Sequence, residues 1–139
     1  MPSRQPAPNQ NVAGMLDIWL TWTGNADMDL VWTTPNNFSI CPFNGSAVGC
    51  AQTSPDGAVA SIDSAGPNGM ESVLFADSYP PGNHIGTAQL FNGVSADFTI
   101  DMKLNGNVIS SFSGTLDQQN PELIGVVNVP ASSGGGGHP

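Results

Sequence analysis

The segment ADFTIDMKLNGNVISSFSG, residues 96–114, decides the fold because it contains two strand-like runs joined by a two-residue turn. Apolar and polar side chains alternate from residue 96 to residue 104, which is the period of a half-buried β-strand. Asn105-Gly106 follows, and both residue types tolerate the positive φ angles that a tight hairpin turn needs. The segment therefore predicts an antiparallel β-hairpin.

Similar runs recur along the rest of the chain and are separated by turn residues such as Tyr79-Pro80-Pro81-Gly82 and Asn92-Gly93. No helical period is present. The pattern predicts an all-β fold, an antiparallel β-sandwich of immunoglobulin-like type with about eight strands. The predicted strands are residues 15–22, 28–33, 58–62, 72–76, 84–91, 96–104, 107–114 and 123–129.

Length and composition agree with a single β-domain flanked by tails. The chain has 139 residues, with 17 Gly and 12 Pro, which suits one core and many turns. Residues 1–12 are rich in Pro, Gln and Asn, and residues 131–139 are rich in Gly. Such segments pack poorly. We expect the sandwich to span residues 13–130, between an N-terminal and a C-terminal tail.

The charge balance restricts the partners. Lys and Arg number 2 against 11 Asp and Glu, and the formal net charge is −9. Nucleic acids and anionic membrane surfaces bind mainly through cationic side chains, so neither is an expected partner. No apolar run reaches membrane-spanning length, so we expect no membrane insertion. The acidity either keeps the protein soluble or provides carboxylates for inorganic cations.

Cys41 and Cys50, the two cysteines of the chain, are close enough in sequence to form a disulfide. Closing a loop of about ten residues would stabilise the fold by roughly 2.5 kcal/mol. A disulfide would indicate an extracellular or periplasmic protein, whereas the alternative is two free buried thiols. MPSRQPAPNQN, residues 1–11, lacks the apolar part of a signal peptide. Export would then require a leader that has been removed, or another route.

The segment GNADMDLVWTTP, residues 24–35, carries Asn25, Asp27 and Asp29 at alternate positions. In an extended strand these side chains share one face, with Cα atoms about 7 Å apart. Neighbouring carboxylates repel, so they favour a proton or a cation between them. Calcium accepts six to eight oxygen ligands. An EF-hand is excluded, because Leu30 and Asn36 occupy the positions that need Gly and Glu.

The segment SIDSAGPNGMESV, residues 61–73, can supply the remaining ligands. Asp63 ends one predicted strand and Glu71 begins the next, with a turn-rich loop between them. Asp56 and Asp77 are weaker candidates on neighbouring turns, where Asp is common for local hydrogen-bonding reasons. Each acid has the alternative of being a solvated turn residue. The predicted calcium ligands are Asn25, Asp27, Asp29, Asp63 and Glu71.

Four segments together resemble the YfaP-type domain, a bacterial domain of unknown function. They are WLTWTGNADMDLVWTTPNN (19–37), SIDSAGPNGMESVLF (61–75), YPPGNHIGTAQLF (79–91) and FTIDMKLNGNVISSFSGTL (98–116). The A-D-x-D-L and P-G pieces are the most specific, and the resemblance covers residues 15–129. It implies a secreted or periplasmic β-sandwich. It also places Asp27, Asp29, Asp63 and Glu71 on the acidic positions of the family motif.

An enzymatic function is not expected. His84 is the one histidine outside the tails, and we expect it to face solvent or a neighbouring strand rather than a catalytic serine. Asp27 and Asp29 are too close and too similar to divide acid and base roles in glycoside hydrolysis. The chain also lacks a Gly-rich phosphate loop.

Trp19 suggests a binding role. If Trp22 faces inward with Ile18 and Leu20, then Trp19 faces outward, where it could stack on a sugar or contact another subunit. The alternative is that the N-terminal tail covers it. We therefore expect a calcium-stabilised extracellular structural or adhesive module that assembles into a surface polymer with copies of itself or other surface proteins. The alternative is a carbohydrate-binding module that uses Trp19 and a bound cation.

Overall fold

A computed structural model describes residues 10–42, 50–64 and 68–131, with only the backbone described for residues 63 and 64. These residues form strands and no helix, which confirms the all-β prediction. Eight strands have six or more residues, and each coincides with a predicted run. The strands are β1 (Val12–Ala13), β2 (Leu16–Thr23), β3 (Asp27–Thr33), β4 (Ser39–Ile40), β5 (Cys50–Ala51), β6 (Ala58–Ser64), β7 (Met70–Phe75), β8 (Ser78–Tyr79), β9 (Gly82–Asn92), β10 (Ser95–Leu104), β11 (Asn107–Asp117) and β12 (Glu122–Val129).

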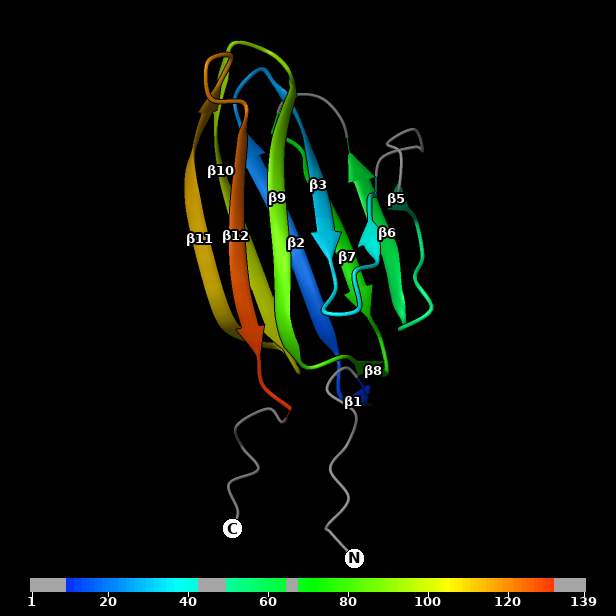
Figure 1. Ribbon diagram of the computed structural model, residues 1–139. Helices are drawn as coiled ribbons and strands as arrows, with labels where there is room; N and C mark the ends of the chain where they lie inside the picture. Colours follow the sequence, from blue (N-terminus) through cyan, green and yellow to red (C-terminus); the bar gives the residue numbers. More distant parts are fainter. Residues whose placement is uncertain (1–9, 43–49, 65–67, 132–139) are drawn as a thin grey trace, which may run out of the picture.

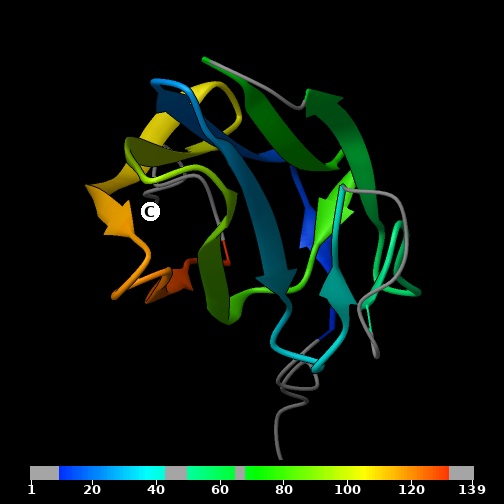
Figure 2. The same cartoon turned by 90° about the horizontal axis from the view of Figure 1, so that it is seen from above.

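The strands form two five-stranded sheets that face each other (Figures 1 and 2). The first sheet has the order β11-β10-β2-β7-β6, and the second has the order β12-β9-β3-β4-β5. β1 and β8 form a separate two-stranded ribbon. All neighbouring strands are antiparallel except β4 and β5, which are parallel. This arrangement confirms the predicted sandwich.

The core lies between the inner faces of the two sheets, where strand alternation places the apolar side chains. Ile18, Leu20 and Trp22 of β2 point inward as predicted. Each fully buried large apolar side chain contributes roughly 1.5–3 kcal/mol of transfer free energy. The largest fully buried side chains are Trp32, Tyr79, Phe75, Leu16, Ile18, Leu20, Met28, Leu30, Ile40, Ile100, Met102 and Leu104.

The hairpin expected at residues 96–114 is present as β10 and β11. Leu104 and Asn107 are register partners across the turn. Asn105 and Gly106 have φ angles of 51° and 88°. The residue types that predicted the turn are therefore the ones that adopt its left-handed backbone.

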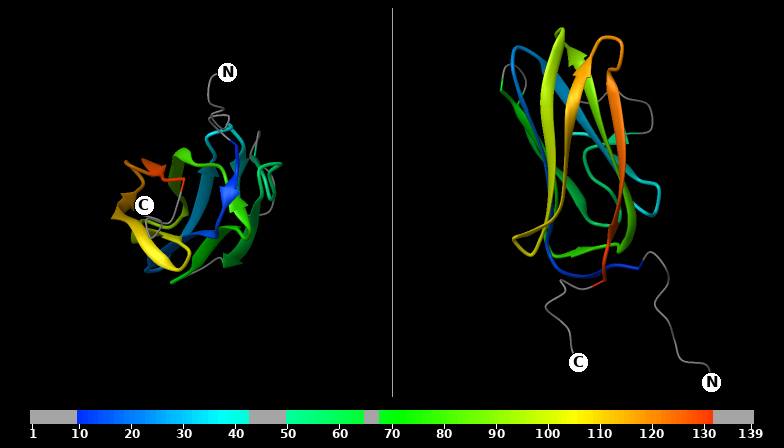
Figure 3. Two further views of the ribbon diagram at one scale, coloured as in Figure 1. Left: turned by 90° about the horizontal axis from the view of Figure 1, so that it is seen from below. Right: turned by 90° about the vertical axis from the view of Figure 1, so that its left-hand side faces the viewer.

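The described part of the chain begins and ends at the same end of the sandwich (Figures 1 and 3). There, the Tyr79 hydroxyl donates a 2.7 Å hydrogen bond to the Pro130 carbonyl and ties β8 to the end of β12. The β2–β3 connection and the β9–β10 turn lie at the opposite end (Figure 1).

Cys41 and Cys50 form a disulfide beside β4 and the edge strand β5, as predicted. Residues 43–49 of its loop lie outside the described residues. The disulfide indicates folding in an oxidising compartment. The described ranges contain no helix of the length and hydrophobicity that a membrane span requires.

Candidate metal centre

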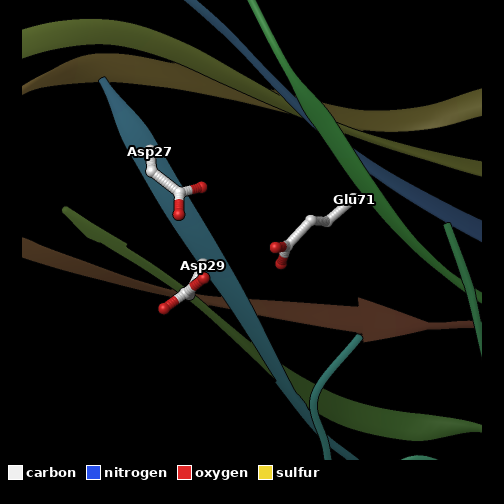
Figure 4. Close-up of side chains that lie close together, drawn as sticks. All are labelled: Asp27, Asp29 and Glu71. Carbon is white, nitrogen blue, oxygen red and sulfur yellow. The ribbon is translucent and has the colours of Figure 1, made fainter. Parts of the chain in front are cut away.

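Three carboxylates from the two sheets meet between β3 and β7. One oxygen each of Asp27, Asp29 and Glu71 lies within 4.8 Å of the others. We call these residues the acidic cluster. Asp27 and Asp29 come from β3 of the second sheet, and Glu71 reaches across from β7 of the first sheet (Figure 4).

Glu71 reaches β3 because the neighbouring strand β4 is short. β4 pairs only with Trp32 and Thr33, so it leaves the earlier part of β3 without a strand on that side. The Leu30 backbone N–H donates a 2.8 Å hydrogen bond to Glu71 Oε1. Glu71 thus caps a backbone donor that a longer β4 would have paired.

Three hydrogen bonds hold the two acid-bearing segments together. The Asn68 N–H donates to the Gly24 carbonyl at 3.2 Å. The Gly24 N–H donates to Asn68 Oδ1 at 3.0 Å. The Trp22 N–H donates to the Gly69 carbonyl at 3.2 Å. Because these bonds join the start of β7 to the β2–β3 connection, Glu71 and Asp27 are brought side by side despite their separation in sequence.

The connection that precedes Asp27 is fixed from two further directions. The Trp22 indole N–H donates a 2.9 Å hydrogen bond to the Ala26 carbonyl. Gly93, in the β9–β10 turn, approaches so closely that a Cβ there would lie 2.9 Å from both Ala26 Cβ and the Asn25 carbonyl oxygen. The connection that leads into Asp27 and β3 is therefore firmly packed.

The acidic cluster is largely removed from water. Glu71 is fully buried, Asp29 is 9% exposed, and Asp27 is half-buried. Lys103, the one lysine or arginine within the described ranges, lies in β10 opposite Asp17, on the outer face of the first sheet. Gathering carboxylates in a buried place costs free energy unless protons or a cation offset their repulsion. Three carboxylates suit a hard cation such as calcium.

The other predicted ligands have different placements. Asn25 is exposed and lines a hollow of about 190 Å³ together with Asp27. Asp63 lies in β6 as the register partner of Glu71, but its side chain is outside the described residues. Asp56 accepts hydrogen bonds from the Ser54 hydroxyl and, at 2.9 Å, from Asn36 Nδ2. Asp77 is exposed next to β8.

His84 was expected to face either solvent or a neighbouring strand. It is fully buried, so the first of these two expectations is wrong. Trp32 Nε1 donates to His84 Nδ1 at 2.9 Å, and His84 Nε2 lies 2.7 Å from the Pro80 carbonyl. The ring is therefore neutral, with its proton on Nε2. Burial lowers the pKa of His84, although the Pro80 hydrogen bond and the charge of Asp56 partly oppose this.

Trp19 points outward as predicted and is half-buried. It lies on the outer face of the first sheet, between its register partners Asp101 and Ser72. Glu71, the neighbour of Ser72, points to the inner face. Trp19 and the acidic cluster are thus on opposite faces of the first sheet and do not share a surface.

A second hollow, of about 240 Å³, borders the acidic cluster on the outer face of the second sheet. The sequence did not single out its exposed aromatic residue, Phe91, although the Asn92-Gly93 turn signal lies directly beside it. Phe91 lies beside an irregularity in the pairing of β9 with β3, which the sequence does not predict. The lining residues are Asp29, Gln89, Leu90, Phe91, Pro121 and Glu122.

The solved structures to which this chain is similar include two from the DUF4425 family. One is a DUF4425 family protein from Bacteroides ovatus ATCC 8483, with 8% identity and a TM-score of 0.44, covering 88% of this chain and 98% of that chain. The other is a domain of unknown function, DUF4425, from Bacteroides vulgatus ATCC 8482, with 7% identity and a TM-score of 0.42. The match covers 84% of this chain and 94% of that chain. No protein-family model and no curated protein matches the chain.

Proposed function

We propose that this protein is a calcium-stabilised, non-enzymatic structural or adhesive module that works outside the cytoplasm. The observation that carries the proposal is the acidic cluster, in which Asp27, Asp29 and Glu71 bring oxygens within 4.8 Å of one another from two sheets. A calcium ion there would join β3 to β7 and replace carboxylate repulsion by coordination.

The disulfide between Cys41 and Cys50 supports an extracellular or periplasmic location. We also propose that the chain is related to the YfaP-type domain. That resemblance likewise implies a secreted or periplasmic sandwich. Calcium is abundant outside cells, where modules with modest affinity are occupied.

Metal analysis of the purified protein, followed by thermal unfolding in millimolar calcium and in EGTA, tests the metal. We expect calcium to raise the melting temperature, because a ligand that binds only the native state stabilises it. Asp29→Asn should abolish the shift, whereas Asp77→Asn, a matched change at an exposed acid, should leave it intact. Identical melting curves of the parent protein in calcium and EGTA would reject the calcium site.

Self-assembly is supported by β12, the edge strand of the second sheet. Ile124 and Val126 are 59% and 64% exposed on it, and Glu122 is its one charged residue. An edge strand with exposed apolar side chains and a single charged residue at one end is prone to pair with another chain. The net charge of −9 opposes association, so we propose that calcium promotes it.

Size-exclusion chromatography with and without calcium tests the assembly. We expect larger species in calcium, and we expect Val126→Lys to suppress them. Val94→Lys is the control, because Val94 is 75% exposed but lies in the β9–β10 connection. A strict monomer under both conditions rejects self-assembly and leaves the calcium site untouched.

The second candidate function is carbohydrate binding. It is favoured by aromatic side chains that reach the surface beside polar groups: Trp19 on the first sheet and Phe91 on the second. Neutral carbohydrate suits a protein with so few cationic residues, whereas nucleic acid does not.

A further inference from the structure

The hollow next to the acidic cluster combines an exposed aromatic ring with aligned polar side chains. Asp29, Gln89 and Glu122 are register partners across β3, β9 and β12, and so form one row on the outer face of the second sheet. Gln89 Nε2 donates a 2.9 Å hydrogen bond to Glu122 Oε2, which fixes both groups. Phe91 stands two residues after Gln89 in the same strand.

Phe91 lies at a β-bulge on the surface. Asp27 pairs with Asn92 while Met28 pairs with Leu90, so Phe91 has no register partner in β3. The Leu90 N–H donates a 2.7 Å hydrogen bond to the Pro121 carbonyl and holds the irregular segment against β12. Bulges re-aim side chains and are frequent beside binding sites. Phe91 is 73% exposed, so the face of its ring is open to a ligand.

We propose that this hollow binds one sugar residue of a neutral glycan chain, with the ring of Phe91 as the stacking surface. This rests on carbohydrate binding, the second proposed function. The apolar face of a pyranose packs on an aromatic ring, while its hydroxyls donate to carboxylates and accept from amides. Phe91, Glu122 and Gln89 supply these three groups in one place.

The size and charge of the hollow narrow the ligand further. Its volume of about 240 Å³ lies just below the range of roughly 300–1,000 Å³ that holds drug-sized molecules, so it suits a single ring of a longer chain. Asp29 and Glu122 would repel an acidic polysaccharide. Asp29 also belongs to the acidic cluster, so a cation that orients its carboxylate would make binding calcium-dependent.

Native affinity electrophoresis through gels that contain a soluble glucan, mannan or xylan tests the proposal, with hyaluronan as the acidic polysaccharide. We expect at least one neutral polysaccharide to retard the protein in calcium, with weaker retardation in EGTA and none in hyaluronan. Phe91→Ala should weaken binding at least tenfold, and Glu122→Gln severalfold. Val94→Ala should have no effect, because Val94 is equally exposed near the same turn but does not line the hollow.

Failure of the hollow and failure of carbohydrate binding give different results. If no polysaccharide retards the protein, both are rejected. If retardation survives Phe91→Ala but is lost in Trp19→Ala, the protein binds glycans through the outer face of the first sheet and the hollow is rejected. Retardation that no variant changes also rejects the hollow. Because Phe91→Ala removes an exposed side chain, we expect the variant to fold like the parent protein, and its melting curve checks this.

Discussion

His84 and Glu71 are both fully buried polar residues, but their surroundings differ in kind. The two ring nitrogens of His84 face a donor, the Trp32 indole, and an acceptor, the Pro80 carbonyl. That ring is neutral and its environment is complete without any ligand. Glu71 instead meets two further carboxylates. Hydrogen bonds offset the free-energy cost of burying a neutral polar group, whereas several buried like charges require a counter-charge to offset their repulsion.

The largest loss of stability is expected when the hydrogen-bonded surroundings of His84 are removed. His84→Ala would leave a cavity and would remove the partners of the buried Trp32 indole N–H and the Pro80 carbonyl. We expect a loss of about 3–5 kcal/mol in the free energy of unfolding, measured by urea denaturation. The loss should be the same in calcium and EGTA. A cost below about 1 kcal/mol would show that the His84 environment is dispensable.

Glu71→Gln probes the other region with little change in shape. Glutamine keeps an oxygen that can accept from the Leu30 N–H, but it removes one negative charge. In calcium the parent protein should be more stable, by about 2.7 kcal/mol if the ion is present at 100 times its dissociation constant. In EGTA the variant should be as stable as the parent protein or more stable, because it has one carboxylate fewer in the acidic cluster and therefore less charge repulsion. A variant that keeps the full calcium shift would contradict the role of Glu71.

The packing beneath the acidic cluster can be tested with a pair of glycines. Gly93 and Gly106 both have positive φ angles, of 111° and 88°. A Cβ at Gly93 would press on Ala26 and Asn25, whereas a Cβ at Gly106 meets nothing within 4 Å. We expect Gly93→Ala to cost about 2–3 kcal/mol and Gly106→Ala about 1 kcal/mol by urea denaturation. Gly93→Ala should also weaken the calcium shift. Equal costs would show that strain in φ, and not the contact, governs both sites.

The fold was largely predictable because the local signals agree with one another. Alternation, turn residues and the Asn105-Gly106 hairpin located all eight long strands. Pairing and sheet order were not predictable, because they depend on contacts between residues that are distant in sequence. The two-residue strands β1, β4, β5 and β8 carry too few residues to show a period.

The candidate site was predictable in its residue types but only partly in its geometry. Asp27, Asp29 and Glu71 were selected because carboxylates without basic neighbours attract cations, and the fold brings them together. The bulge at Phe91 and the short length of β4 could not be predicted from the sequence. The burial of His84 was missed because its partner, Trp32, is 52 residues away. An alternating strand alone does not reveal such a pairing.

The smallest effect is the pH dependence, which again separates the neutral centre from the charged one. In the unfolded chain His84 has its ordinary pKa of 6.5, and in the folded protein its pKa is lower because the ring is buried. Below pH 6.5 the unfolded state therefore binds a proton that the folded state does not. Stability is complete above pH 6.5 and falls as the pH drops toward the folded pKa, with a slope of at most about 1.4 kcal/mol per pH unit.

Urea denaturation between pH 7.5 and 5.5 in EGTA measures this slope without a contribution from calcium release. His84→Gln should give a flatter pH profile than the parent protein, whatever its absolute stability, since glutamine does not titrate. Carboxylates that titrate in this range contribute equally to both proteins and cancel in the difference. Parallel profiles would mean that His84 takes up its proton as readily in the folded protein as in the unfolded chain, and the hydrogen bond from Trp32 would then not hold the ring neutral.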